Sequence, residues 1–213
     1  MVSSRKPISG IIFDAGDILV HKIPDNKLKI WDEVSNVLNN SKIDFQTQFT
    51  NLYDKVRTLG ANFSSECVST SLSEYNLIKI SLIEKYEIEK WWENPDPLTF
   101  ETISKLWELG YKIGILTDSA RPSSIIREVL GRMSNFFHQI VSSRDIGVMK
   151  PDKKMYSSII SALRILPRRA LFIAHDPDEI KGAIESGLLI ENYEAIGNLQ
   201  KLVEVIQQKY FYR

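Results

Sequence analysis

The apolar residues near the start of the chain predict a short buried strand. Residues 8–13 are mostly apolar and β-branched, and they run directly into the turn-forming residues 14–17. From about residue 25 to residue 92 the apolar positions instead recur at helical spacing, with no convincing strand among them. This part of the chain is therefore expected to form one strand, a loop and a group of helices.

The pattern changes at residues 94–97, where two prolines each disfavour helix in the residue before them. Beyond this break, helical segments alternate with short apolar strands. Such alternation is typical of a parallel sheet covered by helices on both faces, so the sequence predicts the α/β class. The predicted helices cover residues 98–109, 123–130 and 153–163, and the predicted strands cover residues 113–116, 140–141 and 170–174.

Three of the predicted strands end in residues that can carry chemistry. In open α/β sheets, ligands bind beyond the carboxyl ends of the strands, so polar residues at these ends are the functional candidates. They are Asp14, Thr117, Asp118, His175 and Asp176.

Composition narrows the class of partner. Lysine and arginine total 27, as do aspartate and glutamate, so the formal net charge is zero and a small molecule is a better expected partner than nucleic acid or an anionic membrane. No signal peptide is visible, and no apolar run approaches the roughly twenty residues that cross a bilayer. The single cysteine, Cys67, cannot form an internal disulfide, which fits a cytoplasmic protein.

The strand-end candidates lie in four segments with a recognisable order. The segments are Ile-Ile-Phe-Asp14-Ala-Gly-Asp-Ile-Leu, Gly-Ile-Leu-Thr117-Asp-Ser, Ser-Arg-Asp-Ile-Gly-Val-Met-Lys150-Pro-Asp and Phe-Ile-Ala-His-Asp176-Pro-Asp-Glu-Ile-Lys-Gly-Ala. One such segment alone would be weak evidence for any family, because an aspartate after a strand is common. Together, in this order, they resemble the haloacid dehalogenase-like hydrolase superfamily over residues 8 to about 188.

This resemblance implies a Rossmann-like, doubly wound parallel sheet with an inserted all-helical cap domain. The core domain would comprise residues 1–22 and 94–213, and the cap domain residues 23–93. The cap would close over the active site and exclude water. The sequence does not name the substrate, because the candidate contacts near the cap are equally well explained as surface charges and core aromatics. These candidates are Lys22, Lys27, Arg57 and Trp91.

The resemblance also assigns catalytic roles. Asp14 would attack phosphorus and form an aspartyl-phosphate, which is covalent catalysis by a carboxylate. Because a carboxylate and a phosphate repel each other, cations are needed, and the resemblance supplies Lys150 and a bound Mg²⁺. Thr117 would donate its hydroxyl to a phosphoryl oxygen.

The first segment departs from the family pattern at Gly16. The family usually has an aspartate there, which protonates the leaving group and later activates water. A metal could still use the backbone carbonyl of Gly16, but a glycine cannot transfer a proton. Asp17, where the family normally has glycine, is a possible substitute whose reach the sequence leaves open.

The fourth segment is also unusual, because His175 stands between Ala174 and Asp176. Mg²⁺ prefers oxygen ligands, which favours Asp176 over His175 as the ligand beside Asp14 and the Gly16 carbonyl. Glu179 or Asp178 could hold a metal-bound water. His175 itself is expected to be a hydrogen-bonded loop histidine, with a catalytic role as the alternative.

Three functions remain open on the sequence alone. The leading hypothesis is a magnesium-dependent phosphatase of a small phosphorylated metabolite. A metal-independent 2-haloacid dehalogenase would use the same aspartate against carbon, and Gly16 gives that alternative some weight. A non-catalytic relative that serves binding or assembly would explain both departures, although the retention of Asp14, Thr117 and Lys150 argues against it.

Overall fold

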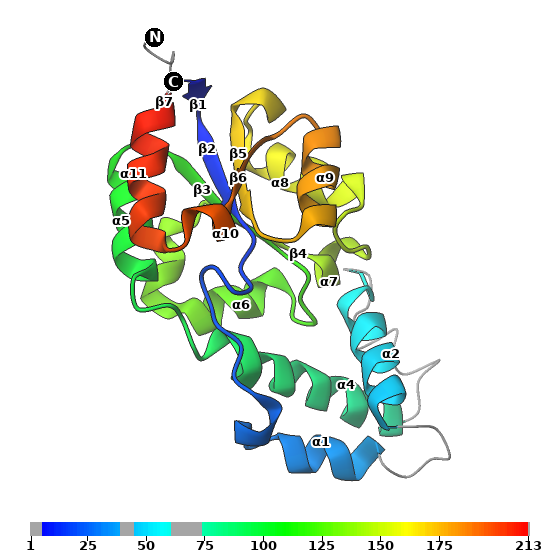
Figure 1. Ribbon diagram of the computed structural model, residues 1–213. Coiled ribbons are helices and arrows are strands. Elements are labelled where there is room, and N and C mark those ends of the chain that lie inside the picture. Colours follow the sequence, from blue (N-terminus) through cyan, green and yellow to red (C-terminus); the bar gives the residue numbers. More distant parts are fainter. Residues whose placement is uncertain (1–5, 39–44, 61–73, 213) are drawn as a thin grey trace.

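The structure is a computed structural model that describes residues 6–38, 45–60 and 74–212 (Figure 1). Five parallel strands form its central sheet, in the order β4-β3-β2-β5-β6. The α/β class and the parallel sheet are thereby confirmed. The strands are β2 (Gly10–Phe13), β3 (Lys112–Thr117), β4 (Gln139–Ser142), β5 (Ala170–Ala174) and β6 (Leu189–Asn192).

Helices cover both faces of this sheet because the strands are apolar on both sides. Within β2, Ile11 and Phe13 pack in the apolar cluster that includes α5 (Thr99–Glu108) and α11 (Leu199–Lys209), whereas Ile12 packs with α8 (Lys153–Leu163). Successive strand residues point to opposite faces, so a central strand of this kind must be apolar throughout. Helix α9 (Pro177–Glu185) lies on the α8 side, opposite α5 and α11 (Figure 1).

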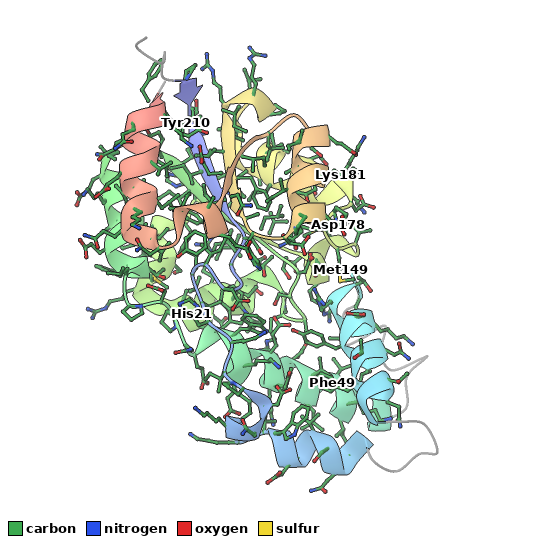
Figure 2. All side chains as sticks on the ribbon, viewed as in Figure 1. His21, Phe49, Met149, Asp178, Lys181 and Tyr210 are labelled. Carbon is green, nitrogen blue, oxygen red and sulfur yellow. The ribbon has the colours of Figure 1, made fainter. Side chains whose placement is uncertain are left out.

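Three helices form a separate group below the sheet (Figure 1). They are α1 (Trp31–Leu38), α2 (Phe45–Arg57) and α4 (Glu74–Glu87), and α4 continues into a π-helical turn, η2 (Ile88–Trp92). Phe49 of α2 points into this group (Figure 2). It belongs to an apolar cluster that holds the three helices together and includes Val34, Val56 and Ile83. The helical spacing of apolar residues predicted this group, which we call the cap.

Two chain segments connect the cap to the sheet, and they contact each other. Val20 and Pro95 form an isolated antiparallel bridge, and Asn94 donates its side-chain amide to the carbonyl of His21. The imidazole Nε2 of His21 lies 2.7 Å from Asp96 Oδ2 across the same pair of segments. The cap is therefore inserted between two neighbouring points of the chain, while the boundaries at residues 22/23 and 93/94 stay a prediction.

Some elements differ from the sequence expectation. The strand expected over residues 8–13 is interrupted at Ser9, so that β1 (Lys6–Ile8) pairs with the C-terminal β7 (Tyr210–Tyr212) in a separate sheet. No helix among the described residues has the length and apolar character needed to cross a membrane. Cys67, on which the cytoplasmic expectation rested, lies outside the described residues. The remaining elements are η1 (Asp25–Lys27), α6 (Ser123–Leu130), η3 (Gly131–Phe136), α7 (Ser143–Ile146), η4 (Pro167–Arg169) and α10 (Tyr193–Ile196).

Candidate active site

Asp14 and Lys150 form a buried ion pair at the carboxyl end of β2. The backbone N–H of Asp14 donates to the carbonyl of Ile173 on β5, which extends the sheet by one residue and fixes the carboxylate at its edge. Lys150 Nζ lies 2.6 Å from Asp14 Oδ1 and 3.1 Å from Glu179 Oε2. Burial by itself lowers the pKa of Lys150, but the negative charges of Asp14 and Glu179 outweigh it and raise the pKa. These two carboxyl groups therefore favour the charged ammonium form of Lys150, which contacts the candidate nucleophile.

The end of β3 supplies the next two residues. Thr117 is only 6% exposed and lines the same cavity as Asp14. Asp118 accepts a hydrogen bond from the backbone N–H of Lys150 through Oδ1, at 3.0 Å, and its Oδ2 lies 3.9 Å from the guanidinium of Arg57 in the cap. Burial raises the pKa of Asp118, against the opposing charge of Lys150. Asp118 therefore positions the segment that carries Lys150.

The fourth segment places His175, and not Asp176, beside the nucleophile. His175 Nδ1 lies 3.8 Å from Asp14 Oδ2, is buried and has no hydrogen-bond partner among the described residues. The carboxylate of Asp176 instead caps α9, accepting hydrogen bonds from the backbone N–H groups of Asp178 and Glu179. Asp176 is exposed and does not line the cavity, so this geometry does not support the choice of Asp176 over His175 as a metal ligand.

Glu179, in the first turn of α9, reaches back to the buried ion pair. Its carboxylate shares Lys150 with Asp14. Burial raises the pKa of Glu179 to about 8, with the negative charges of Asp14 and Asp118 adding to the effect and Lys150 opposing it. Asp178, the other residue considered for this role, is exposed and outside the cavity lining.

Gly16 and Asp17 border the cavity on the loop after Asp14. Asp17 adopts a left-handed backbone conformation, with φ of 56°, and its side chain is exposed. Gly16 does not have a positive φ, and a Cβ placed there would make only ordinary contacts with Trp91, at 3.6 Å. The backbone therefore does not require glycine at position 16.

A cavity of about 480 Å³ lies between the cap and the sheet edge. Of the cap contacts considered from sequence, Lys22, Arg57 and Trp91 line it, whereas Lys27 does not. The sequence analysis did not identify several residues that line the cavity. The only signal that could have indicated them is a position on the side of the cap that faces the sheet. The missed residues are Asp25, Phe49, Thr50, Tyr53, Asp54, Tyr86, Glu87, Lys90 and Trp92.

The floor of this cavity offers oxygen ligands for a bound cation. The carboxyl groups of Asp14, Asp118 and Glu179 line it, beside the ammonium of Lys150 and the guanidinium of Arg57. Among the described residues no three His, Cys, Asp or Glu side chains are grouped as a ready-made metal site. Mg²⁺ commonly binds through one or two carboxylates with waters and substrate phosphate, so the floor fits a magnesium ion held mainly by Asp14.

Comparison with known proteins gives a consistent result. Residues 8–187 match the family of haloacid dehalogenase-like hydrolases. A glyceraldehyde 3-phosphate phosphatase of Methanocaldococcus jannaschii is 22% identical over 94% of this chain and 97% of its own length. One from Methanopyrus kandleri is 25% identical over 63% of this chain, and that match spans only about half, 54%, of the relative's length.

Two solved structures share the fold. The phosphatase of this superfamily from Thermococcus onnurineus has a TM-score of 0.66 and 19% identity, covering 95% of this chain and 99% of that one. The 2-haloacid dehalogenase from Pseudomonas syringae has a TM-score of 0.68 and 17% identity, covering 94% and 99%. Both chemistries thus occur on the arrangement of elements seen here.

Proposed function

The chain belongs to the haloacid dehalogenase-like hydrolases, and from that premise we propose that it hydrolyses the phosphate ester of a small metabolite through an aspartyl-phosphate on Asp14. The observation that carries the proposal is the 2.6 Å contact between Lys150 Nζ and Asp14 Oδ1, two largely buried side chains. A carboxylate that is ionised, fixed and partnered by a cation is what attack on an anionic phosphoryl group needs.

The first half of the reaction forms a bond between an Asp14 oxygen and phosphorus and breaks the ester bond to the leaving alkoxide. Lys150 offsets the repulsion between the carboxylate and the phosphoryl oxygens, while Thr117 donates its hydroxyl to one of them. Phosphoryl transfer passes through a loose transition state and leaves the protein little covalent chemistry to perform. Positioning and charge compensation therefore supply most of the catalysis. The leaving oxygen must also gain a proton, and Gly16 offers none.

The second half is attack of water on the aspartyl-phosphate, which returns Asp14 and releases phosphate. A base would help this step, and the candidates are side chains that line the cavity. Asp17 borders the cavity with an exposed carboxylate, and His175 lies 3.8 Å from Asp14 Oδ2. We infer that Asp17 assists proton transfer, and that without an acid at position 16 turnover is slow.

We further infer that Mg²⁺ is the cofactor. Asp14 and the backbone carbonyl of Gly16 would hold it, with Glu179 retaining one of its waters. When bound, the ion would lower the negative charge of the phosphoryl group. Support comes from the carboxyl oxygens of Asp14 and Glu179 at the cavity floor, because Mg²⁺ prefers oxygen ligands.

The substrate is proposed to be a small phosphorylated metabolite. The curated relatives named as glyceraldehyde 3-phosphate phosphatases act on a substrate of this kind, and a cavity of about 480 Å³ is within the usual range for small ligands. A screen of phosphorylated metabolites, with released phosphate as the readout, would identify the substrate.

Tetrafluoroberyllate provides the direct test of the mechanism. We expect crystals soaked with Mg²⁺ and this phosphate mimic to show it on the Asp14 carboxylate, beside Lys150. A mimic that never binds Asp14, together with no hydrolysis across the screen, would instead favour a non-catalytic role.

Dehalogenation remains the second candidate, because Gly16 lacks the acid that phosphatases of this family use. It requires no metal, so halide release measured with and without a chelator distinguishes it from phosphate hydrolysis. The acidic residues Asp118 and Glu179 at the cavity floor favour the phosphatase.

A further inference from the structure

Helix α4 of the cap directs two carboxylates into one short core segment, residues 119–121. Glu84 Oε2 accepts a hydrogen bond from the guanidinium of Arg121 at 2.7 Å. Glu87, one turn later, accepts hydrogen bonds from the hydroxyl of Ser119 and from the backbone N–H of Ala120. Glu84 therefore holds the end of a long side chain, whereas Glu87 holds the segment itself.

The core holds the same segment from its other side. The hydroxyl of Ser142 donates to the carbonyl of Arg121 at 2.7 Å, and the hydroxyl of Ser143 donates to the carbonyl of Ser119 at 3.2 Å. Ser142 is the last residue of β4, which pairs with β3, and Ser143 is the first residue of α7. The cap thus accepts hydrogen bonds from Ser119 and Ala120, while the core donates to the carbonyls of Ser119 and Arg121.

Glu87 also accepts hydrogen bonds from two side chains of the cap. The hydroxyl of Tyr53 on α2 donates to Oε2 at 2.9 Å, and the indole N–H of Trp92 lies 3.4 Å from Oε1. Glu87 is only 2% exposed; burial raises its pKa, while the hydrogen bonds from Ser119, Ala120 and Tyr53 oppose the rise. A buried carboxylate is rarely more stabilising than an apolar side chain of the same size, so stability alone gives little reason for it.

The segment follows directly after two residues of the site. Thr117 is the proposed phosphoryl contact, and Asp118 holds the backbone N–H of Lys150. A movement of residues 119 and 120 would shift both. Displacements of about 1 Å at such a site can cost about a hundredfold in rate.

We propose that Glu87 is a positioning residue, which fixes Ser119 and Ala120 when the cap is seated on the core and thereby sets Thr117 and Asp118 for phosphoryl transfer. The inference rests on the proposed phosphatase function. Under this proposal, the positions of Thr117 and Asp118 depend on the position of the cap, so that catalysis is coupled to closure of the cap over the core.

The test compares Glu87→Gln with Glu84→Gln. The amide in Glu87→Gln keeps the volume but points hydrogens at groups that are themselves donors. Glu84→Gln changes the same helix one turn away, outside the cavity lining and without a backbone contact to the segment. With p-nitrophenyl phosphate as substrate and orthovanadate as phosphoryl mimic, Glu87→Gln should lower kcat and weaken vanadate binding by about tenfold or more, about 1.4 kcal/mol or more. Glu84→Gln should stay within about twofold of wild type, under 0.5 kcal/mol on the same scale.

Ser119→Ala is the second variant if Glu87→Gln does not fold. It removes one donor from the loop side without burying a new polar group, and it should weaken vanadate binding in the same direction. A folded Glu87→Gln protein, or failing that a folded Ser119→Ala protein, with wild-type kcat and vanadate affinity would overturn the proposal.

Hydrogen exchange separates this inference from the proposed function. If the wild-type protein hydrolyses no phosphate ester, the function fails, but the coupling is still measurable as amide exchange over residues 117–121. Faster exchange there in Glu87→Gln, and not in Glu84→Gln, supports the coupling. Equal exchange in both variants and wild type contradicts it.

Discussion

Lys150 and Asp14 are 136 positions apart in the chain, and their side chains meet at 2.6 Å. The sheet brings them together, because Asp14 directly follows β2 and Lys150 is held by Asp118, which directly follows the neighbouring β3. Glu179 completes the group from the first turn of α9. The nucleophile of the proposed reaction is thus paired before any substrate arrives.

Asp14→Asn should leave the fold intact and remove turnover. The amide has nearly the same shape, but it lacks the charge and the nucleophilic oxygen that the covalent step requires. Circular dichroism and a phosphatase assay test the two parts, and Asp178→Asn, at an exposed residue outside the cavity lining, is the matched control. Activity within about tenfold of wild type, only about 1.4 kcal/mol in barrier, would rule out the covalent mechanism.

Asp176→Ala should act on stability and not on metal use. Its carboxylate caps α9, so its loss should cost about 1 kcal/mol of unfolding free energy, whereas Asp176→Asn, which can still cap, should cost little. His175→Ala removes the side chain next to Asp14 Oδ2 and should raise the Mg²⁺ requirement more, by about tenfold.

Thermal unfolding and magnesium titration of these variants give the two readouts. The sequence alone favoured the opposite order of metal effects. An Asp176→Ala protein that needed more Mg²⁺ than His175→Ala would restore Asp176 as the ligand.

Gly16→Asp should accelerate the hydrolysis of alkyl phosphates more than that of aryl phosphates. A poor alkoxide leaving group needs protonation far more than an aryl oxide does, and general acid help is typically worth about a hundredfold to ten-thousandfold. The backbone permits the change, because Gly16 has no positive φ and a Cβ there meets Trp91 at 3.6 Å. Wild-type enzyme should show a burst of released alcohol with an activated substrate.

Gly16→Asn controls for the size of the new side chain in these assays. If Asp17→Asn in the wild-type background abolished activity as fully as Asp14→Asn, Asp17 would already supply the proton. The premise that an acid is missing would then be wrong.

Glu87 should make stability depend on pH. Burial raises the pKa of its carboxyl in the folded protein, so the folded state keeps the proton to higher pH than the unfolded chain. The contribution of this group to the unfolding free energy therefore falls as pH rises above the unfolded value of about 4.3, by at most about 1.4 kcal/mol per unit.

The corresponding experiment is urea unfolding of wild type and Glu87→Gln at about pH 5 and about pH 7.5. Glutamine does not titrate, so the stability of the variant relative to wild type should improve at the higher pH. A difference that stays constant, or moves the other way, contradicts the raised pKa. Glu84→Gln is the size-matched control.

The sequence by itself determined the arrangement of elements and the principal chemistry of the site. Apolar runs of strand length alternating with helical periods predict a parallel sheet, and such a sheet brings the residues after its strands to one edge. Asp14 and Thr117 could therefore be placed together before any coordinates, and the resemblance added Lys150. The same reasoning could not predict that the first strand is interrupted at Ser9, because the residues on both sides of the break are apolar.

Tertiary structure decided how side chains are directed where regular elements end. Asp176 follows a strand as Asp14 does, yet its carboxylate satisfies the free N–H groups at the start of α9, which leaves His175 facing Asp14. Glu87 is one of three acidic residues on α4, and only tertiary packing gives it four donors, two from residues 119–120 of the core and two from the cap. The spacing of apolar residues predicts which face of a helix or strand a residue occupies. Which side chain it contacts there depends on packing between segments that are distant in the chain.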